Sequence, residues 1–528
     1  MIERPFRPAL RRGLAALTAL TLAAAACSDD EPAGTSAGES GGESGETTGG
    51  RLVVAQASPV RKLDFVGILD TSAFTVFQTN VLEGLTRAVL DEDGDLTWEP
   101  ALAESWDREG PSQWRFHLRE DVSFHDGRPF TSADVVFTVG RITAEDAEVG
   151  ILLGNIERAE AVDEHTVDIF TKQPTEFLDR AVSGLTVIPD GWGEDAAAAA
   201  SQLPGTGPYR LVEYGNGEDV LLELNPDYWG DNEGAFEEVQ IRTIPEAGSR
   251  LAALEAGEVD VALQLSPELA GAAPKVLTTA GAEVEFFRLT NKGVLADKRV
   301  RQALNMAVDR EVLIESIRSG YATLPNAQQI PPQTFGYNTD LEDYPFDPEG
   351  AEELLEEAGA LGKPLSMVCS ADSYGAVGQD SCSTVAQMVR DVGLDVKLDI
   401  LPKDAYIEQF FAKQNGLPQP DLVYIISGTD TLTADTPMRV WYDCENGRNA
   451  FCDPEVEAKV MEATTLGLEE QEEAWKDLMA ELHDQAPMLW LTVPEVVVGV
   501  ARDVEGPIFP LTGANGDADW SKWRRVAS

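Results

Sequence analysis

Histidine and basic residues are scarce in this chain of 528 residues, which holds four His and 40 Lys and Arg against 92 Asp and Glu. Beyond residue 50 it contains no HExxH pair, no GxSxG turn and no P-loop, so the short motifs of zinc peptidases, serine hydrolases and nucleotide hydrolases are absent there. Acidic residues are so numerous that paired carboxylates say nothing about glycosidase chemistry. The formal net charge of −52 excludes nucleic acid as a default partner. We therefore expect a protein that is not an enzyme and needs no metal or cofactor.

The apolar run at residues 13–26 is too short for a permanent membrane span, which needs roughly 20 apolar residues. Four arginines precede it and Cys27 follows, a pattern typical of an export signal. Residues 25–27, Ala-Ala-Cys, are similar to the lipobox of bacterial lipoproteins, in which the Cys is acylated. An ordinary secretory signal with a chance Cys is the alternative. Residues 28–50 are small, polar and acidic, which predicts a flexible tether without a core.

Cysteine is also rare, with five in the whole chain. Besides Cys27 there are four, which allow three connectivities. The near-neighbour pairs, Cys369 with Cys382 and Cys444 with Cys452, close the shortest loops, and we expect both pairs to form in an oxidising compartment. The spacings fit no CxxC zinc pattern.

Residues 114–137, WRFHLREDVSFHDGRPFTSADVVF, carry the most informative pattern. Apolar and polar residues alternate over 114–118, which predicts a strand with one buried face. Residues 125–127, His-Asp-Gly, predict a turn. Thr131 or Ser132 then caps a helix whose first turn holds an aspartate.

Five more short motifs surround this signature in order: NVLEGL at 80–85, PALAESW at 100–106, GTGPY at 205–209, NPDYW at 225–229 and AGEVD at 256–260. Together with the signature they resemble the extracytoplasmic solute-binding proteins, family 5 type, of peptide, nickel and glycoside ABC importers. The resemblance covers almost all of residues 51–500. It implies a binding receptor whose transporter partner hydrolyses ATP.

The fold that the resemblance implies is α/β, of the large periplasmic peptide-binding class, with two lobes, an inserted subdomain and a two-strand hinge. We expect five parts: a lipoprotein signal at 1–27, a tether at 28–50, lobe I from 51–88, 205–285 and 493–528, the inserted subdomain at 89–204, and lobe II at 286–492.

Three local patterns in the second half predict secondary structure. Residues 297–313 predict one amphipathic helix capped by Asp297. A second helix begins at Asp347-Pro348 and stops before Gly359. Residues 363–401 read as strand, helix and strand, which indicates a parallel sheet.

A solute receptor needs a cleft with apolar walls and a few polar groups that orient the ligand. In the peptide-binding branch of the family, a carboxylate meets the α-ammonium of the ligand shortly before a disulfide-bearing loop. Counting back from Cys444, Asp435 falls where that acid lies, and Asp430 is its neighbour. The alternative is that both acids are turn residues on a polar loop.

Other candidate ligand-binding residues rest on weaker signals. Trp441 and Tyr442 could wall the pocket, with an ordinary core position as the alternative. Phe74 and Asn80 lie in the segment that lines the cleft in relatives, and Asn291 sits where the family has an asparagine that joins the lobes. We disfavour His125 as a nickel ligand, because it has no partner nearby in the sequence.

The predicted function is capture of an extracellular solute, most simply a short peptide, by hinge closure and delivery to an ABC importer. The protein would be a monomer, anchored by lipid to the outer face of the cell membrane. A receptor for an oligosaccharide, an opine or a nickel chelate is an alternative, and so is a surface sensor or interaction lipoprotein without a transport role. The acidic surface either attracts cationic ligands or is a solvated surface suited to salt.

Overall fold

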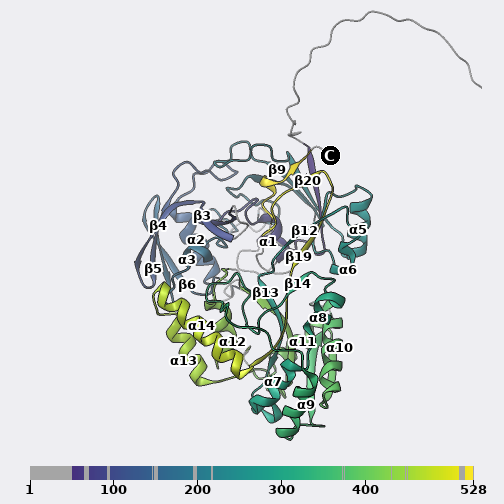
Figure 1. The fold of residues 1–528 in the computed structure, drawn as a ribbon. Coiled ribbons are helices and arrows are strands. Elements are labelled where there is room, and N and C mark those ends of the chain that lie inside the picture. Colours follow the sequence, from purple (N-terminus) through teal and green to yellow (C-terminus); the bar gives the residue numbers. More distant parts are fainter. Residues whose placement is uncertain are drawn as a thin grey trace, which may run out of the picture. The chain divides into compact units, whose positions relative to one another are not determined.

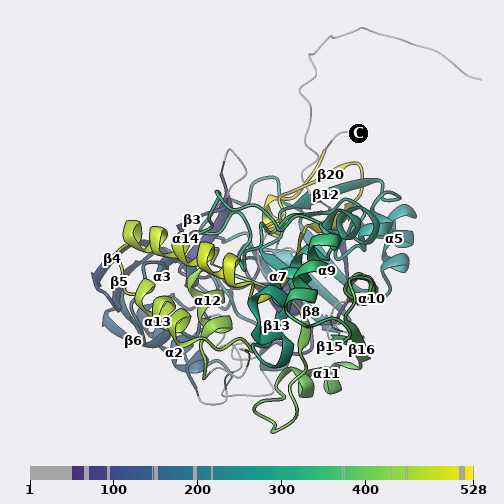
Figure 2. The same cartoon turned by 60° about the horizontal axis from the view of Figure 1, so that its bottom comes forward.

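The computed structural model (Figures 1 and 2) describes the chain from residue 50 onward, and the described residues belong to one compact unit. The described residues are 50–526 without 65–70, 92–95, 145–146, 148–152, 194–198, 216–217, 372, 374, 430, 446–447, 449 and 510–517. The predicted export signal, Cys27, the tether up to residue 49 and Asp430 lie outside them.

The first large sheet has seven strands in the order β12-β19-β11-β1-β10-β9-β8. Its central strand β1 is parallel to both neighbours, and Leu52 and Val54 on that strand are fully buried. Helices α5 (Ala247–Glu255) and α6 (Pro267–Ala270) pack on the sheet beside β11 and β19. The strands are β1 (Arg51–Gln56), β8 (Tyr209–Gly215), β9 (Asp219–Leu224), β10 (Glu238–Thr243), β11 (Val261–Ala262), β12 (Lys275–Thr279) and β19 (Val496–Val500).

The second large sheet has six strands in the order β14-β18-β13-β17-β15-β16. Figures 1 and 2 both show α7 beside α9, and α13 beside α14, around this part of the chain. The strands are β13 (Glu283–Leu289), β14 (Ala322–Thr323), β15 (Pro364–Ser370), β16 (Asp395–Leu401), β17 (Leu422–Gly428) and β18 (Met488–Pro494). The helices are α7 (Lys298–Met306), α8 (Arg310–Val312), α9 (Pro348–Glu357), α10 (Gly375–Asp391), α11 (Lys403–Phe410), α12 (Asp435–Tyr442), α13 (Pro454–Ala463) and α14 (Leu468–Gln485).

A smaller, four-stranded antiparallel sheet, ordered β4-β5-β7-β6, lies between β1 and β8 in the sequence. Helix α2 packs against β6 and β7. The remaining elements of the first half and the C-terminus are α1 (Thr71–Phe77), β2 (Thr86–Leu90), β3 (Leu96–Pro100), β4 (Ala103–Gly110), β5 (Gln113–Leu118), α2 (Ser132–Ile142), β6 (Ile156–Asp163), β7 (Thr166–Thr171), α3 (Leu178–Ala181), β20 (Val504–Glu505) and β21 (Arg524–Arg525).

The chain passes twice between the two large sheets. It runs from β12 into β13 through residues 280–282, and from β18 into β19 through Glu495. These two crossings form the connection that a two-strand hinge requires. The exact bounds of the lobes and of the inserted subdomain stay a prediction.

The signature at residues 114–137 folds as its pattern predicts. Strand β5 buries alternate residues, Gly127 turns the chain at φ +86°, and Thr131 caps α2. The backbone N–H of Thr131 donates to the Asp134 carboxylate at 2.8 Å, the reciprocal half of a capping box. The signature is therefore a locally determined strand, turn and helix.

Two of the three patterns in the second half are confirmed. Asp347 caps α9 by accepting from the Gly350 N–H at 2.9 Å, and Gly359 follows the helix at φ +63°. Strands β15 and β16 are parallel and are joined by α10. Gly359 at positive φ is the ordinary way to end a helix, because it has no Cβ to clash.

The single helix predicted over residues 297–313 is wrong in its length. Asp297 does cap a helix, but α7 ends at Met306, and Asp309 caps a new turn by accepting from the Val312 N–H at 3.2 Å. The buried Arg310 that follows donates to the Trp490 carbonyl at 3.1 Å. This tertiary contact and the second cap override the continuous amphipathic pattern.

Candidate functional site

Glu83, in the NVLEGL motif, lies at a buried junction of three of the sequence motifs. Its carboxylate accepts hydrogen bonds from the Thr206 hydroxyl at 2.8 Å, the Trp229 indole N–H at 2.9 Å and the Tyr228 hydroxyl at 2.9 Å. Thr206 belongs to GTGPY, and the two aromatics belong to NPDYW. These motifs thus bind one another and act as scaffold.

The two glycines of GTGPY are required by the close approach of the NVLEGL backbone. A Cβ on Gly205 would lie 1.7 Å from the Val81 carbonyl oxygen, and one on Gly207 would lie 2.6 Å from the Asn80 carbonyl oxygen. No side chain fits at these distances. The GTGPY turn can therefore pack against residues 80–81 only if positions 205 and 207 are both glycine.

His125 fastens the signature to the same turn. Its Nδ1 accepts from the Gly205 N–H at 3.2 Å, so its Nε2 carries the proton and donates to the Gly207 carbonyl at 3.0 Å. Burial lowers the pKa of His125 to about 4, which keeps the ring neutral at physiological pH. With both nitrogens engaged, this histidine serves structure.

Asp435 lies in a different place, in the first turn of α12, where it lines a cavity of about 260 Å³. One wall of the cavity comes from the second half of the chain and the other from residues 153–181, which span β6, β7 and α3. The lining residues are Leu153, Gly154, Asn155, Ile156, Lys172, Gln173, Thr175, Phe177, Leu178, Ala181, Thr431, Thr433, Asp435, Thr436, Arg439 and Val440.

The carboxylate of Asp435 is buried without full hydrogen bonding. The residue is 7% exposed, and its Oδ1 accepts no hydrogen bond from any residue that the structure describes. Burial raises the pKa of Asp435 to about 6, although the positive charge of Arg439 and the nearby Trp475 indole N–H lower it. A buried carboxylate with a free oxygen is costly unless another group completes its bonding.

Arg439 follows Asp435 by one helical turn and lines the same cavity. Its Nε is buried and has no hydrogen-bond partner among the described residues. Burial lowers the pKa of Arg439, although Asp435 raises it, and a guanidinium stays charged at any physiological pH. The cavity therefore presents an acid and a base on α12 that each have bonding capacity left over. The other base in its lining, Lys172, donates to the Gly154 carbonyl at 2.8 Å.

The aromatic candidates lie in hydrophobic cores. Trp441 is 3% exposed and Tyr442 is 1% exposed, in a cluster where the Trp441 ring meets the Phe286 ring edge to face at 5.3 Å. Phe74 on α1 belongs to the core of the first half. None of the three lines the cavity beside Asp435, and a ligand contact by them stays a prediction.

The two asparagine candidates hold backbone segments that are distant in sequence. Asn80 is fully buried, donates to the Ala518 carbonyl at 3.0 Å and accepts from the Trp520 N–H at 2.9 Å. Asn291 donates to the Cys452 carbonyl at 2.7 Å. Neither lines the cavity, so a role of either one in ligand binding is untested.

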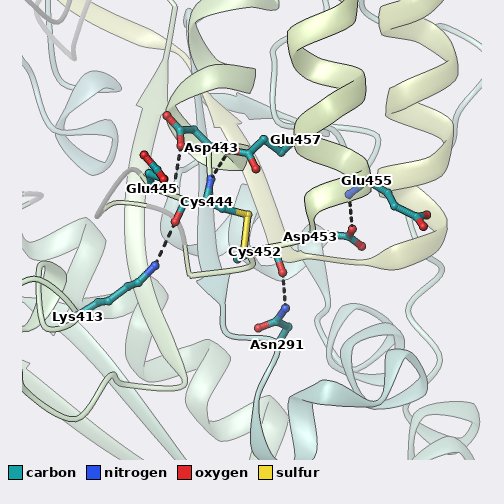
Figure 3. The surroundings of a disulfide bond; sticks show 9 residues. All are labelled: Asn291, Lys413, Asp443, Cys444, Glu445, Cys452, Asp453, Glu455 and Glu457. Carbon is teal, nitrogen blue, oxygen red and sulfur yellow. Dashed lines mark hydrogen bonds between the residues drawn. A yellow bond between two sulfur atoms is a disulfide. The ribbon is translucent and has the colours of Figure 1, made fainter.

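The structure contains both near-neighbour disulfides, Cys369–Cys382 and Cys444–Cys452. Figure 3 shows the second, where the Lys413 ammonium donates to the Cys444 carbonyl at 3.1 Å and Asn291 reaches Cys452 from the other side. This bridge begins two residues after α12 ends. It therefore closes the loop that follows α12, the helix that carries Asp435, in the sequence.

Sequence reasoning missed the cavity wall formed by residues 153–181. Lys172, Gln173 and Phe177 lie on the connection between β7 and α3, which has no periodic pattern and no family motif. Arg439 offered a weak signal, since a basic residue one turn after a candidate acid on a helix lies on the same face.

Two further properties concern the described residues alone. Among them, no group of three or more His, Cys, Asp or Glu could hold a metal ion. No described helix has the length and apolar character that crossing a membrane requires.

Comparison with known proteins shows which family the sequence of this chain resembles. The family model of the bacterial extracellular solute-binding proteins, family 5, matches residues 97–449. Heme-binding protein A of Haemophilus influenzae is 30% identical over 321 residues, which is 54% of this chain and 58% of that protein. The dipeptide-binding protein of Escherichia coli is 26% identical, over 83% of this chain and 89% of the relative.

Solved structures agree on the fold. A periplasmic binding protein, DppA of Helicobacter pylori, solved with the peptide STSA, superposes with a TM-score of 0.73 at 21% identity. The match covers 91% of this chain and 99% of that one. The family model spans well over half of the 528 residues. The chain therefore belongs to family 5 of the bacterial extracellular solute-binding proteins of ABC importers, a family of two-lobed extracytoplasmic receptors rather than enzymes.

Proposed function

We propose that this receptor captures a short peptide in the cavity beside α12 and presents it to an ABC importer. The observation that supports the proposal most strongly is the buried carboxylate of Asp435, a residue that lines the cavity and whose Oδ1 has no hydrogen-bond partner among the described residues. The α-ammonium of a peptide supplies both the charge and the N–H donors that this oxygen lacks.

A peptide also carries a group that suits the second charge in the cavity. Arg439 has a buried Nε that is free of hydrogen bonds within the described chain, and a guanidinium binds carboxylates well. A peptide is a zwitterion, so its ammonium and a carboxylate complement Asp435 and Arg439 together. A neutral oligosaccharide would offer neither charge an opposite charge in this buried site, which is unfavourable.

The cavity volume supports a small ligand. About 260 Å³ lies just below the roughly 300–1,000 Å³ that small-molecule sites usually have. The relatives point the same way, since the Escherichia coli protein is named for dipeptides and the Helicobacter pylori protein was solved with a four-residue peptide.

The decisive experiment compares peptide binding by the wild type and Asp435→Asn. Purified protein is denatured and its released small molecules are identified by mass spectrometry, and affinities for the peptides found are then measured by calorimetry. Asp435→Asn should weaken binding roughly 10- to 100-fold or more, because it removes a charge-assisted bond. Asp477→Asn, at an exposed position on α14, is the matched control.

The pH dependence of binding identifies the carboxylate. Since the pKa of Asp435 is raised to about 6, wild-type affinity should fall as the pH drops through 6 while the peptide ammonium keeps its proton. Asp435→Asn should lose this dependence. Equal affinity of the two proteins would show that Asp435 is not part of the binding site. Sugars or metal chelates among the co-purified molecules would show that the ligand is not a peptide.

Anchoring of the protein to the membrane through a lipid on Cys27 is part of this proposal. The run at residues 13–26 with Cys27 supports a lipid anchor, and the polar tether at 28–50 would let a monomeric receptor reach its transporter. Expression of the full chain with Cys27→Ser should move the protein from the membrane fraction to the soluble one. An unchanged distribution would contradict the anchor.

A further inference from the structure

Arg180, on the short helix α3, is held between aromatic rings on its own side of the molecule. Its guanidinium carbon lies 4.6 Å from the centre of the Trp98 ring and 4.8 Å from the centre of the Phe177 ring. The Trp98 indole in turn donates to the Ser183 hydroxyl, which donates to the Arg180 carbonyl. This packing leaves the planar guanidinium little freedom, so its donors point in a set direction.

Those donors reach a segment about 250 residues further along the chain. The Nη1 of Arg180 donates to the carbonyls of Thr431 and Leu432, each at 3.2 Å. Leu432 has a left-handed φ of +48°, a conformation that a branched residue adopts only when its surroundings hold it. The guanidinium is one of the groups that do so.

A second contact joins the same two segments. The ring of Phe177 meets the ring of Phe335 at 4.8 Å, and Phe335 pairs with the loop at residues 431–434. The Phe335 N–H donates to the Leu432 carbonyl at 2.9 Å, and the Ala434 N–H donates to the Phe335 carbonyl at 3.1 Å. Leu432 thus receives bonds from both sides of the contact.

The loop that Arg180 holds runs directly into α12. Ala434 is the residue before Asp435 and the N-cap of that helix. Thr431 and Thr433 of the loop line the cavity, as do Phe177 and Ala181 from the other side, whereas Arg180 does not. Arg180 therefore lies behind the cavity, where it joins the two walls.

We propose that Arg180 is a positioning residue that latches the segment carrying α3 to the loop preceding Asp435, and so retains the bound ligand. The retention rests on the proposed peptide-binding function. Opening the cavity separates its two walls, and this separation breaks both bonds to the loop carbonyls. The latch should therefore slow ligand release more than it changes capture.

The test uses Arg180→Gln in the full receptor. The hydrogen-bond partners of Arg180 are neutral carbonyls, while its positive charge also acts on Asp179 and Asp435. We expect peptide dissociation at least tenfold faster, a much smaller change in the association rate, and an unchanged thermal midpoint without ligand. Arg180→Lys retains a charged donor for the carbonyls and should restore part of the slow dissociation.

The matched control is Arg158→Gln on β6. Arg158 also stacks on an aromatic ring, that of Phe170 at 3.7 Å, and pairs with Glu157 and Glu160 of its own segment. It makes the same charge change without bonding the loop, and its dissociation rate should match the wild type. A wild-type dissociation rate in Arg180→Gln would overturn the proposal.

Hydrogen exchange of the ligand-free protein separates this proposal from the function it rests on. Amides of residues 431–438 should exchange faster in Arg180→Gln than in the wild type or in Arg158→Gln. If the wild type binds no peptide, the proposed function fails, yet faster exchange still supports positioning of the loop by Arg180. Unchanged exchange in that case overturns the positioning role as well.

Discussion

Glu83 is a buried acid whose titration should be visible in the stability of the whole protein. Burial raises its pKa to about 7, although the hydrogen bonds from Trp229, Thr206 and Tyr228 lower it. The folded state thus holds the proton more tightly than the unfolded chain does. This stabilisation is complete below pH about 4.5 and is lost as the pH rises through about 7.

Substitution of Glu83 by Gln should remove that dependence. Between pH 5 and 7.5 the free energy of unfolding of the wild type should fall relative to Glu83→Gln by up to about 3 kcal/mol. Urea denaturation at a series of pH values measures it, with Glu356→Gln, exposed on α9, as control. Parallel curves for wild type and Glu83→Gln would show that Glu83 titrates normally.

A residue of the candidate site could be predicted only where the family resemblance fixed its distance from a recognisable residue in the sequence. Counting back from Cys444 led to Asp435, which the structure places on a cavity. Arg180 and Phe177 lie about 250 residues away from that acid and have no local pattern to mark them. Asn80 is polar and near a family motif, yet its partners Ala518 and Trp520 are at the other end of the chain.

At the scale of elements, the Cys444–Cys452 bridge lies in the connection between α12, which carries Asp435, and α13. It closes a loop with a sequence separation of 8 residues, and the Cys444 N–H donates to the Glu457 carboxylate on α13 at 3.0 Å. The bridge therefore restrains the connection between α12 and α13, whose helices pack together.

Replacing both Cys444 and Cys452 by Ser should lower the free energy of unfolding by about 2–3 kcal/mol, because a short loop regains its entropy in the unfolded chain. Urea denaturation of this double variant measures the loss. Adding reductant should destabilise the wild type further than the variant, since the variant retains only Cys369–Cys382. Identical midpoints for the two proteins would contradict a stabilising bridge.

The start of a helix could be predicted where the capping side chain accepts a hydrogen bond from a backbone N–H a few residues further along the chain. Asp297 and Asp347 cap helices through the N–H groups two or three residues on, so their signal is local. The end of α7 was missed because it depends on Asp309 and on the buried Arg310, which bonds to β18. A pattern of apolar residues cannot show that a polar cap and a distant strand divide a helix.

At the scale of the whole molecule, charge is the property most open to test. Acidic residues exceed basic ones by 92 to 40, and many acids already form surface pairs, such as Lys298 with Asp484 at 2.8 Å. Exposed pairs of this kind contribute at most about 1 kcal/mol each. The unpaired excess repels itself in the folded state more than in the expanded chain.

Salt should therefore stabilise the protein. The Debye length falls from roughly 30 Å at 0.01 M to about 8 Å at 0.15 M and 3 Å at 1 M, so the thermal midpoint should rise by several degrees with NaCl. Most of the rise should come below about 0.3 M, where repulsion between neighbouring carboxylates becomes screened. A rise that continues linearly to molar salt would instead indicate exclusion of salt from the surface. A flat midpoint would mean that the charges are spaced widely enough for self-repulsion to be negligible in the folded state.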